Sequence, residues 1–264
     1  MTGTIDQGIE RIRRHLTAIG AQSLTLFKGP YFERRLKSRW RACSVADAAG
    51  YADVLDRDPD ERRRLLSALA LGVTGFFRNP SAWIRLRELI KGVPGRPFRA
   101  WSAGCATGEE TWSVAMLLAD RAAAGGLGEW LVLGTDLDDR SLAIARRGEY
   151  SERAAAEIDA VLPDRRCSVA DRRLVVDNAL RPRVEFRRAD LTGSPGPVEF
   201  DLVLCRNVLI YFTTEAQARV MKVLLDTLAV GGLLMLGKAE LAAAEVAARL
   251  HLVDRRERIY RRAA

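Results

Sequence analysis

The stretch that decides the fold is Phe98-Arg99-Ala100-Trp101-Ser102-Ala103-Gly104-Cys105-Ala106-Thr107-Gly108-Glu109-Glu110. Its first five residues have the apolar character of a strand, and an apolar helix is expected over residues 112–124. Between them, small residues form a turn that lets the backbone approach a ligand at the carboxyl end of a sheet strand. The stretch therefore predicts the first strand, turn and helix of a parallel α/β unit.

The residues that follow continue this alternation. Further strands are expected at residues 130–135, 184–186, 200–204 and 232–236, with helices at 141–147 and 214–228. The alternation predicts an α/β fold with a doubly wound, Rossmann-like sheet. Residues 151–183 are rich in arginine and alanine and show no clear periodicity.

The residues before this unit are predicted to be helical. Apolar side chains recur at three- and four-residue spacing from Ile5 to Ile19 and again over residues 65–70. A short amphipathic helix over 83–90 leads into the Gly/Pro-rich segment 91–97, which is typical of a linker.

Composition places the chain among globular proteins. Its 264 residues are 48% hydrophobic, and no run reaches the ~18 consecutive apolar residues of a membrane span. The N-terminus lacks the apolar core of a signal peptide, so we expect a cytoplasmic protein without membrane insertion. The four cysteines are widely spaced and have no metal-binding pattern, and no metal is expected. The net charge of +8 suggests an acidic partner, although an arginine-rich composition explains it equally well.

The glycine-bearing turn carries two acidic residues where a phosphate-binding loop would leave the helix N-terminus free. Glu109 and Glu110 would repel a phosphate, and no Gly-Lys-Ser/Thr sequence is present there. Two carboxylates suit a cationic ligand such as S-adenosylmethionine, which carries an ammonium and a sulfonium.

Asp136 follows the second predicted strand, where doubly wound folds accept hydrogen bonds from ribose hydroxyls. Its distance from Gly104 exceeds the usual ~20 residues, which the loop 125–128 would explain. A purely structural role, with Asp136 capping the next helix, accounts for this pair of features at least as well. Two other segments place polar residues beside apolar ones, namely Thr74 to Arg78 and Cys205 to Phe212.

Together these residues resemble the CheR family of chemotaxis receptor methyltransferases, which modify receptor glutamates. The resemblance rests on Thr74-x-Phe76-Phe77-Arg78, on Trp101 to Glu110, on Thr135-Asp136-Leu137-Asp138, on Cys205 to Phe212, and on Gly231 to Gly237 with Glu240. These segments follow the family's order and spacing from about residue 71 to 241.

The resemblance implies two domains. A helical N-terminal domain over residues 1–80 would dock the substrate, and an S-adenosylmethionine-dependent methyltransferase domain with a reversed final hairpin would occupy 81–264, including a reduced β-subdomain at 151–183. The implied cofactor-binding residues are Thr74, Arg78, Gly104, Glu109, Asp136, Asp190, Leu191, Arg206 and Asn207. The implied docking residues, on a basic helix from Tyr31 to Arg41, are Arg34, Arg35, Lys37, Arg39 and Arg41. Positions that depart from the family pattern include Thr111-Trp112 in place of Pro-Tyr, Asp190 in place of Asn, and Lys238 in place of a small or imidazole residue.

The implied reaction transfers a methyl group to a glutamate side chain and releases S-adenosylhomocysteine. The acceptor would be the cytoplasmic methylation helices of a chemoreceptor-like protein, and we expect a monomer that does not bind nucleic acid. A carboxylate of pKa ~4.3 is ionised at neutral pH and needs no general base. The two histidines, His15 and His251, indeed lie outside every motif. We hypothesise that Arg78 orients the acceptor or cofactor carboxylate and that Tyr211 shapes the acceptor pocket, with a surface ion pair and core packing as the alternatives.

Two other functions fit parts of the pattern. Asn207 to Tyr211 loosely resembles the Asn-Pro-Pro-Tyr loop of amino-methyltransferases, but a base methylator needs an aromatic clamp that Tyr211 alone does not supply. A non-catalytic module that binds the cofactor would explain the departures at Trp112, Asp190 and Lys238, whereas the presence of Arg78, Glu109, Asp136 and Tyr211 argues against it.

Overall fold

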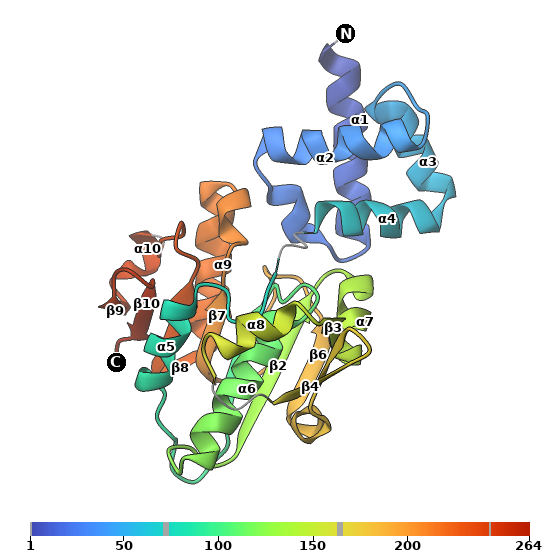
Figure 1. Cartoon of the computed structure of the whole chain (residues 1–264). Coiled ribbons are helices and arrows are strands. Elements are labelled where there is room, and N and C mark those ends of the chain that lie inside the picture. The colour runs from blue at the N-terminus through green and yellow to red at the C-terminus, as the bar shows by residue number, and fades with distance from the viewer. Residues whose placement is uncertain (1, 71–73, 163–165, 243) are drawn as a thin grey trace.

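A computed structural model describes residues 2–70, 74–162, 166–242 and 244–264 (Figure 1). The N-terminal part is helical, as the periodicity predicts. Its elements are α1 (Thr2–Ala18), the 3₁₀ turn η1 (Gln22–Leu26), α2 (Gly29–Ala42), α3 (Ala48–Arg57) and α4 (Pro59–Leu69). The α3 and α4 starts are capped by Asp47 and Asp58, whose carboxylates accept backbone N–H groups of the first turn. The helix α5 (Pro80–Leu89) then leads into the sheet domain.

A seven-stranded sheet forms the larger part of the molecule, in the order β6-β2-β1-β7-β8-β10-β9. Its strands are β1 (Phe98–Ala103), β2 (Trp130–Asp136), β6 (Val184–Arg188), β7 (Phe200–Cys205), β8 (Leu228–Leu236), β9 (Leu250–Asp254) and β10 (Ile259–Arg262). All neighbours pair in parallel except β10, which runs antiparallel to both β8 and β9. The predicted α/β class, doubly wound sheet and reversed final hairpin are confirmed.

Helices pack on both faces of this sheet, except for one face at its β6 edge. The helix α6 (Glu109–Ala123) packs on β1 and β2, α7 (Asp139–Arg147) on β2 and β6, and α9 (Thr214–Thr227) on β8 (Figure 1). The short helix α10 (Ala244–Ala247) lies beside α9. One apolar core joins α6 to the sheet, and a second joins α9, the opposite face and the N-terminal helices.

The segment without clear periodicity contains a second, small sheet. Its antiparallel strands β3 (Glu149–Ser151), β5 (Arg173–Val176) and β4 (Cys167–Ala170) lie in the order β3-β5-β4. The helix α8 (Ala154–Asp159) and the 3₁₀ turn η2 (Asn178–Arg183) complete the segment. Tyr150 on β3 fixes it to the main domain, because its hydroxyl donates to the Thr107 carbonyl at 2.8 Å.

Two glycines allow close packing between neighbouring helices, turns and strands around the first α/β unit. Gly108 has a φ of +93°, and a Cβ there would lie 2.6 Å from the Ala145 Cβ. A Cβ at Gly134 would lie 2.6 Å from the Thr111 hydroxyl. Only glycine therefore fits where the turn after β1 meets α7 and where α6 crosses β2.

No helix in the described ranges combines the length and the apolar character that crossing a bilayer requires.

Candidate active site

Two adjoining pockets lie at the carboxyl ends of β1, β2 and β7, and they share Gly104 and Val208. The first is lined by Ser23, Leu24, Phe27, Ala70, Gly104, Asp136, Leu137, Ala189, Leu191, Val208 and Phe212. The second is lined by Thr74, Gly75, Arg78, Gly104, Cys105, Ala106, Glu110, Arg206, Asn207 and Val208. The structure thus gathers in one place most of the residues that the sequence motifs single out.

The second pocket contains a buried ion pair. Arg206 Nη1 lies 3.4 Å from Glu110 Oε2, and the Ser102 hydroxyl donates to Glu110 Oε1 at 3.0 Å. Burial raises the pKa of Glu110, while Arg206 and Ser102 act in the opposite direction. Arg206 also donates to the carbonyl of Arg78 and to the side chain of Asn79, which fastens the Thr74–Asn79 segment to the end of β7.

Asp136 forms the floor between β2 and the turn after β1. Its carboxylate accepts the backbone N–H of Ala106 at 2.9 Å and that of Asp138 at 3.0 Å. Burial raises the pKa of Asp136, although the two N–H bonds favour its ionised form. Asp138, and not Asp136, caps α7 through Arg140 N–H. The capping explanation of Asp136 is therefore wrong, because the next carboxylate along the chain has that role.

A turn after β7 separates the two pockets, and Glu240 holds it in place. The Glu240 carboxylate accepts backbone N–H groups from Asn207, Val208, Leu209 and Gly237 at 2.6 to 2.9 Å. Asn207 itself has a φ of +62°, a conformation that costs a non-glycine residue energy and persists only where its surroundings enforce it. Glu240 supplies that enforcement from 31 to 33 residues away in the sequence.

The backbone is strained in the other segments that line the second pocket as well. Phe77 and Asn79 have φ values of +46° and +64°, and Ala106 has +47°. Residues in such conformations are found mainly at functional sites, where the packing of the surrounding structure holds them in place.

The N-terminal domain supplies one wall of the first pocket. Leu24 and Phe27 line it, and the Phe27 ring contacts the Phe212 ring at 4.8 Å between centroids. Backbone hydrogen bonds join the two segments, from Lys28 N–H to Tyr211 and from Thr213 N–H to Leu26. Sequence patterns gave no sign of this wall, because it depends on contacts between segments about 185 residues apart.

The two proposed catalytic residues lie in different surroundings. Arg78 is exposed and lines the second pocket beside Thr74. Tyr211 lines neither of the two pockets, and its ring packs on Tyr31 of α2 at 4.7 Å between centroids. The Tyr211 ring therefore packs against the N-terminal domain.

Several expected site residues have other contacts. Glu109 accepts from the Thr107 hydroxyl, and it is the neighbouring Glu110 that lines the second pocket. Asp190 accepts Ser23 N–H at 2.8 Å and both the N–H and the hydroxyl of Thr192, whereas its neighbour Leu191 lines the first pocket.

Two of the residues that depart from the family pattern have identifiable partners in the structure. The indole N–H of Trp112 donates to the Ala145 carbonyl at 2.9 Å, so this buried ring ties α6 to α7. Lys238 lies 3.4 Å from Glu257, in the loop after β8.

The basic residues of α2 divide into two groups. Arg34, Lys37 and Arg41 are exposed and border one shallow surface depression. Arg39 turns inward and makes two hydrogen bonds of 2.9 and 2.6 Å to Glu61, which also accepts from the Tyr51 hydroxyl. Arg35 donates to the Tyr31 hydroxyl, and both Arg34 and Arg35 lie over the Tyr31 ring. Arg39 thus ties α2 to α4 within the helical domain and is less exposed than Arg41.

The donors and acceptors of the two pockets fit S-adenosylmethionine. Asp136 offers an acceptor to ribose hydroxyls, Leu137 and Leu191 offer an apolar surface to a base, and Glu110 offers a carboxylate to an ammonium. A seven-stranded sheet with a reversed last strand and such a site at its carboxyl edge defines a Rossmann-like methyltransferase.

Comparisons with known proteins identify the family. Residues 72–258 match the CheR methyltransferase SAM binding domain, and residues 7–70 match the CheR methyltransferase all-alpha domain. The chain belongs to the CheR methyltransferase family, and its cofactor is S-adenosylmethionine.

Two relatives named as methyltransferases support this assignment. The chain is 31% identical to chemotaxis protein methyltransferase 2 of Pseudomonas aeruginosa, over 89% of this chain and 86% of that protein. It is 32% identical to the probable biofilm formation methyltransferase WspC of Pseudomonas putida, over 88% of this chain but only 54% of that protein. It also spans 27% of an uncharacterized 104.1 kDa protein of Rhodobacter capsulatus, at 30% identity over 96% of this chain.

Among solved structures, a TehB-like SAM-dependent methyltransferase from Corynebacterium glutamicum aligns with a TM-score of 0.41 and 17% identity, over 77% of this chain and 93% of that one.

Proposed function

We propose that this chain forms methyl esters on glutamate side chains of a chemoreceptor-like signalling protein. The observation that carries the proposal is that the exposed basic residues of α2 lie on the helix whose Tyr31 packs against Tyr211, beside the cofactor pockets. An acidic acceptor helix held by α2 would therefore lie close to the reacting methyl group.

The cofactor is assigned to both pockets. We place the ribose at Asp136, the base against Leu137 and Leu191, and the methionine part between Glu110 and Arg78. This gives Glu110 the contact that the motif had suggested for Glu109. Gly104, Thr74, Arg206 and Asn207 complete the lining.

Binding in both pockets requires a movement of the turn between them. Their volumes of about 40 and 20 Å³ are far below the about 300–1,000 Å³ typical of ligand sites. Val208 separates them, and one of its methyl groups would lie 3.1 Å from a Cβ at Gly104. We infer that cofactor binding displaces Val208, and that only glycine at position 104 leaves room for the ligand.

The reaction places few demands on the protein beyond alignment. When bound, S-adenosylmethionine supplies a methyl group on a sulfonium and is released as S-adenosylhomocysteine. Arg78 orients either the acceptor carboxylate or the carboxylate of the cofactor's methionine part by charge-assisted hydrogen bonds, while Tyr211 positions α2 relative to the pocket. The glutamate is already ionised, so no residue has to remove a proton.

The positions of the two histidines agree with a reaction that needs no imidazole base. His15 of α1 pairs with Asp56 of α3 at 2.8 Å within the helical domain, and His251 lies on β9, at the edge of the sheet.

The test is the chemical stability of the product. The chain is incubated with methyl-tritiated cofactor and a lysate of its own organism, and the labelled protein is then treated with mild alkali. We expect a labelled band that releases volatile tritiated methanol and that is missing with Asp136→Ala. Label that survives alkali would indicate an N-methyl product, and cofactor binding without any label would indicate a non-catalytic module. Either result would overturn the proposal.

A further inference from the structure

The sheet has an uncovered face at its β6 edge. In a doubly wound fold, the connection between two parallel strands usually carries a helix that packs on the sheet. Residues 189–199, which connect β6 to β7 and are all described, form only turns and bends. The consequence appears on β2, where Val132 is 2% exposed beneath α6 and Leu131, on the opposite face, is 44% exposed.

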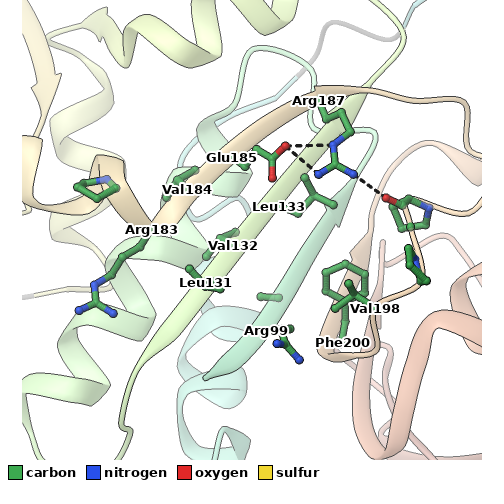
Figure 2. A pocket seen from close by; sticks show the side chains of 15 residues that line it. Arg99, Leu131, Val132, Leu133, Arg183, Val184, Glu185, Arg187, Val198 and Phe200 are labelled. Carbon is green, nitrogen blue, oxygen red and sulfur yellow. Dashed lines mark hydrogen bonds and ion pairs between the residues drawn. The ribbon is translucent and has the colours of Figure 1, made fainter. Parts of the chain in front are cut away.

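The uncovered face forms a groove of about 530 Å³ across β6, β2 and β1 (Figure 2). Its apolar lining includes Leu131, Leu133, Val184, Val198 and Phe200. Pro195 to Val198, from the connection, close one side. The groove lies over the amino-terminal halves of β1 and β2 and shares no lining residue with the two cofactor pockets.

Three arginines border this groove, and two of them have no ion-pair partner among the described residues. Arg187 is paired with Glu185 at 2.8 Å and donates to the Pro195 carbonyl, as Figure 2 shows. The Arg99 guanidinium donates to no acceptor in the described part of the chain, and Arg183 lies over the Trp130 ring without a carboxylate. The groove therefore combines an apolar floor with two positive charges.

We propose that this groove, which we call the β6 groove, binds a short acidic peptide segment with bulky apolar side chains, contributed by a partner protein. Apolar side chains would cover Leu131 and Leu133, and carboxylates would pair with Arg99 and Arg183. Three strands at about 4.8 Å spacing give a floor only about 10 Å wide. That width suits a few residues of one segment and not the ~800 Å² that each partner buries in a stable dimer interface.

The site is independent of the methyl-transfer proposal, since it lies outside the cofactor pockets. A partner bound there would leave the carboxyl edge of the sheet open. The β6 groove would thus attach the enzyme to a partner without occupying the acceptor site.

The test selects peptides without assuming their sequence. Phage-displayed random dodecapeptides are selected on the full chain in the presence of S-adenosylhomocysteine, and enriched peptides are synthesised with a fluorescent label and measured by anisotropy. We expect enriched peptides to combine Asp or Glu with Leu, Ile, Phe or Trp. Leu131→Glu and Arg99→Glu should each weaken binding at least tenfold.

Matched controls separate the groove from general surface effects. Leu252→Glu replaces a similarly exposed leucine on β9, and Arg14→Glu replaces an exposed arginine on α1; both should change peptide affinity less than twofold. All four variants should keep their affinity for S-adenosylhomocysteine, which reports folding.

Three results would overturn the proposal. They are the absence of enriched acidic-apolar peptides, peptide binding that Leu131→Glu does not weaken, and a dimer in sedimentation equilibrium that Leu131→Glu dissociates. The last result would assign the groove to a second copy of the chain.

Discussion

Replacing Glu240 tests whether one buried carboxylate holds the turn that separates the cofactor pockets. The carboxylate accepts four backbone N–H groups, and the residue is only 3% exposed. Glu240→Ala leaves these four donors without their acceptor. A buried donor without a partner costs about 1–3 kcal/mol. Taking the lower value, because water can enter the space left by the side chain, gives a loss of about 4 kcal/mol in the free energy of unfolding.

Glu240→Gln is the conservative comparison. Its carbonyl oxygen can still accept from Val208 and Leu209, but its amide group would face the N–H groups of Asn207 and Gly237, which are donors too. Two orphaned donors give a loss of about 2 kcal/mol. The expected order of stability is therefore wild type, Gln, then Ala.

Urea unfolding followed by tryptophan fluorescence measures these losses, with Glu129→Ala, an exposed glutamate, as the control. Isothermal titration with S-adenosylhomocysteine should show weaker binding for both variants, because Asn207 and Val208 line the pockets. An Ala variant within 1 kcal/mol of wild type and with unchanged affinity would refute this account of the turn.

Three further changes test other parts of the site. Asp190→Ala should lower the free energy of unfolding by about 1–2 kcal/mol, because Ser23 N–H loses its acceptor. The affinity for S-adenosylhomocysteine should change less than twofold. A large loss of affinity in calorimetry would show that Asp190 contacts the cofactor. S-adenosylmethionine affinity should fall as pH decreases from neutral. Burial raises the pKa of Glu110, and the carboxylate that attracts the ammonium is present only above that pKa. Binding titrations from pH 8 to 5 should show a weaker pH dependence of affinity for Glu110→Gln than for the wild type. Arg41→Glu should raise the KM for the acceptor several-fold and reduce its salt dependence, with kcat little changed, whereas Arg57→Glu on α3 should leave initial-rate kinetics as they are.

Local pattern was sufficient to predict the five parallel strands of the main sheet and the carboxyl edge at which Gly104 and Asp136 lie, whereas the final hairpin of β9 and β10 was expected only from the family resemblance. The apolar strand 200–204 is buried on both faces, which makes its sequence signal strong. The small sheet was harder to predict, since β4 is largely exposed and lies among arginines and alanines. Its strands gain their stability from mutual pairing, which a single segment does not reveal.

The site shows the same limit at the scale of single residues. The motif Gly108-Glu109-Glu110 does not determine which glutamate faces the pocket, because adjacent residues on a helix point about 100° apart. The role of Glu240 and the wall formed by Phe27 depend on contacts across 31 or more residues. Asp136 could be singled out because its position at the end of β2 is itself a local feature.

Under the proposed function, the contacts between the domains would link acceptor docking to cofactor binding. Leu24 and Phe27 line the cofactor pocket only a few residues before α2 begins, and the backbone bonds of Leu26 and Lys28 join them to the turn that carries Tyr211. A movement of α2 therefore changes the wall of the pocket. Coupling free energies are reciprocal. If acceptor docking changes the affinity for the cofactor by some factor, the cofactor changes the affinity for the acceptor by the same factor. The product, which keeps the nucleoside but lacks the methyl group, would then still hold the domains together, and release of the methylated acceptor would depend on how fast the first pocket opens.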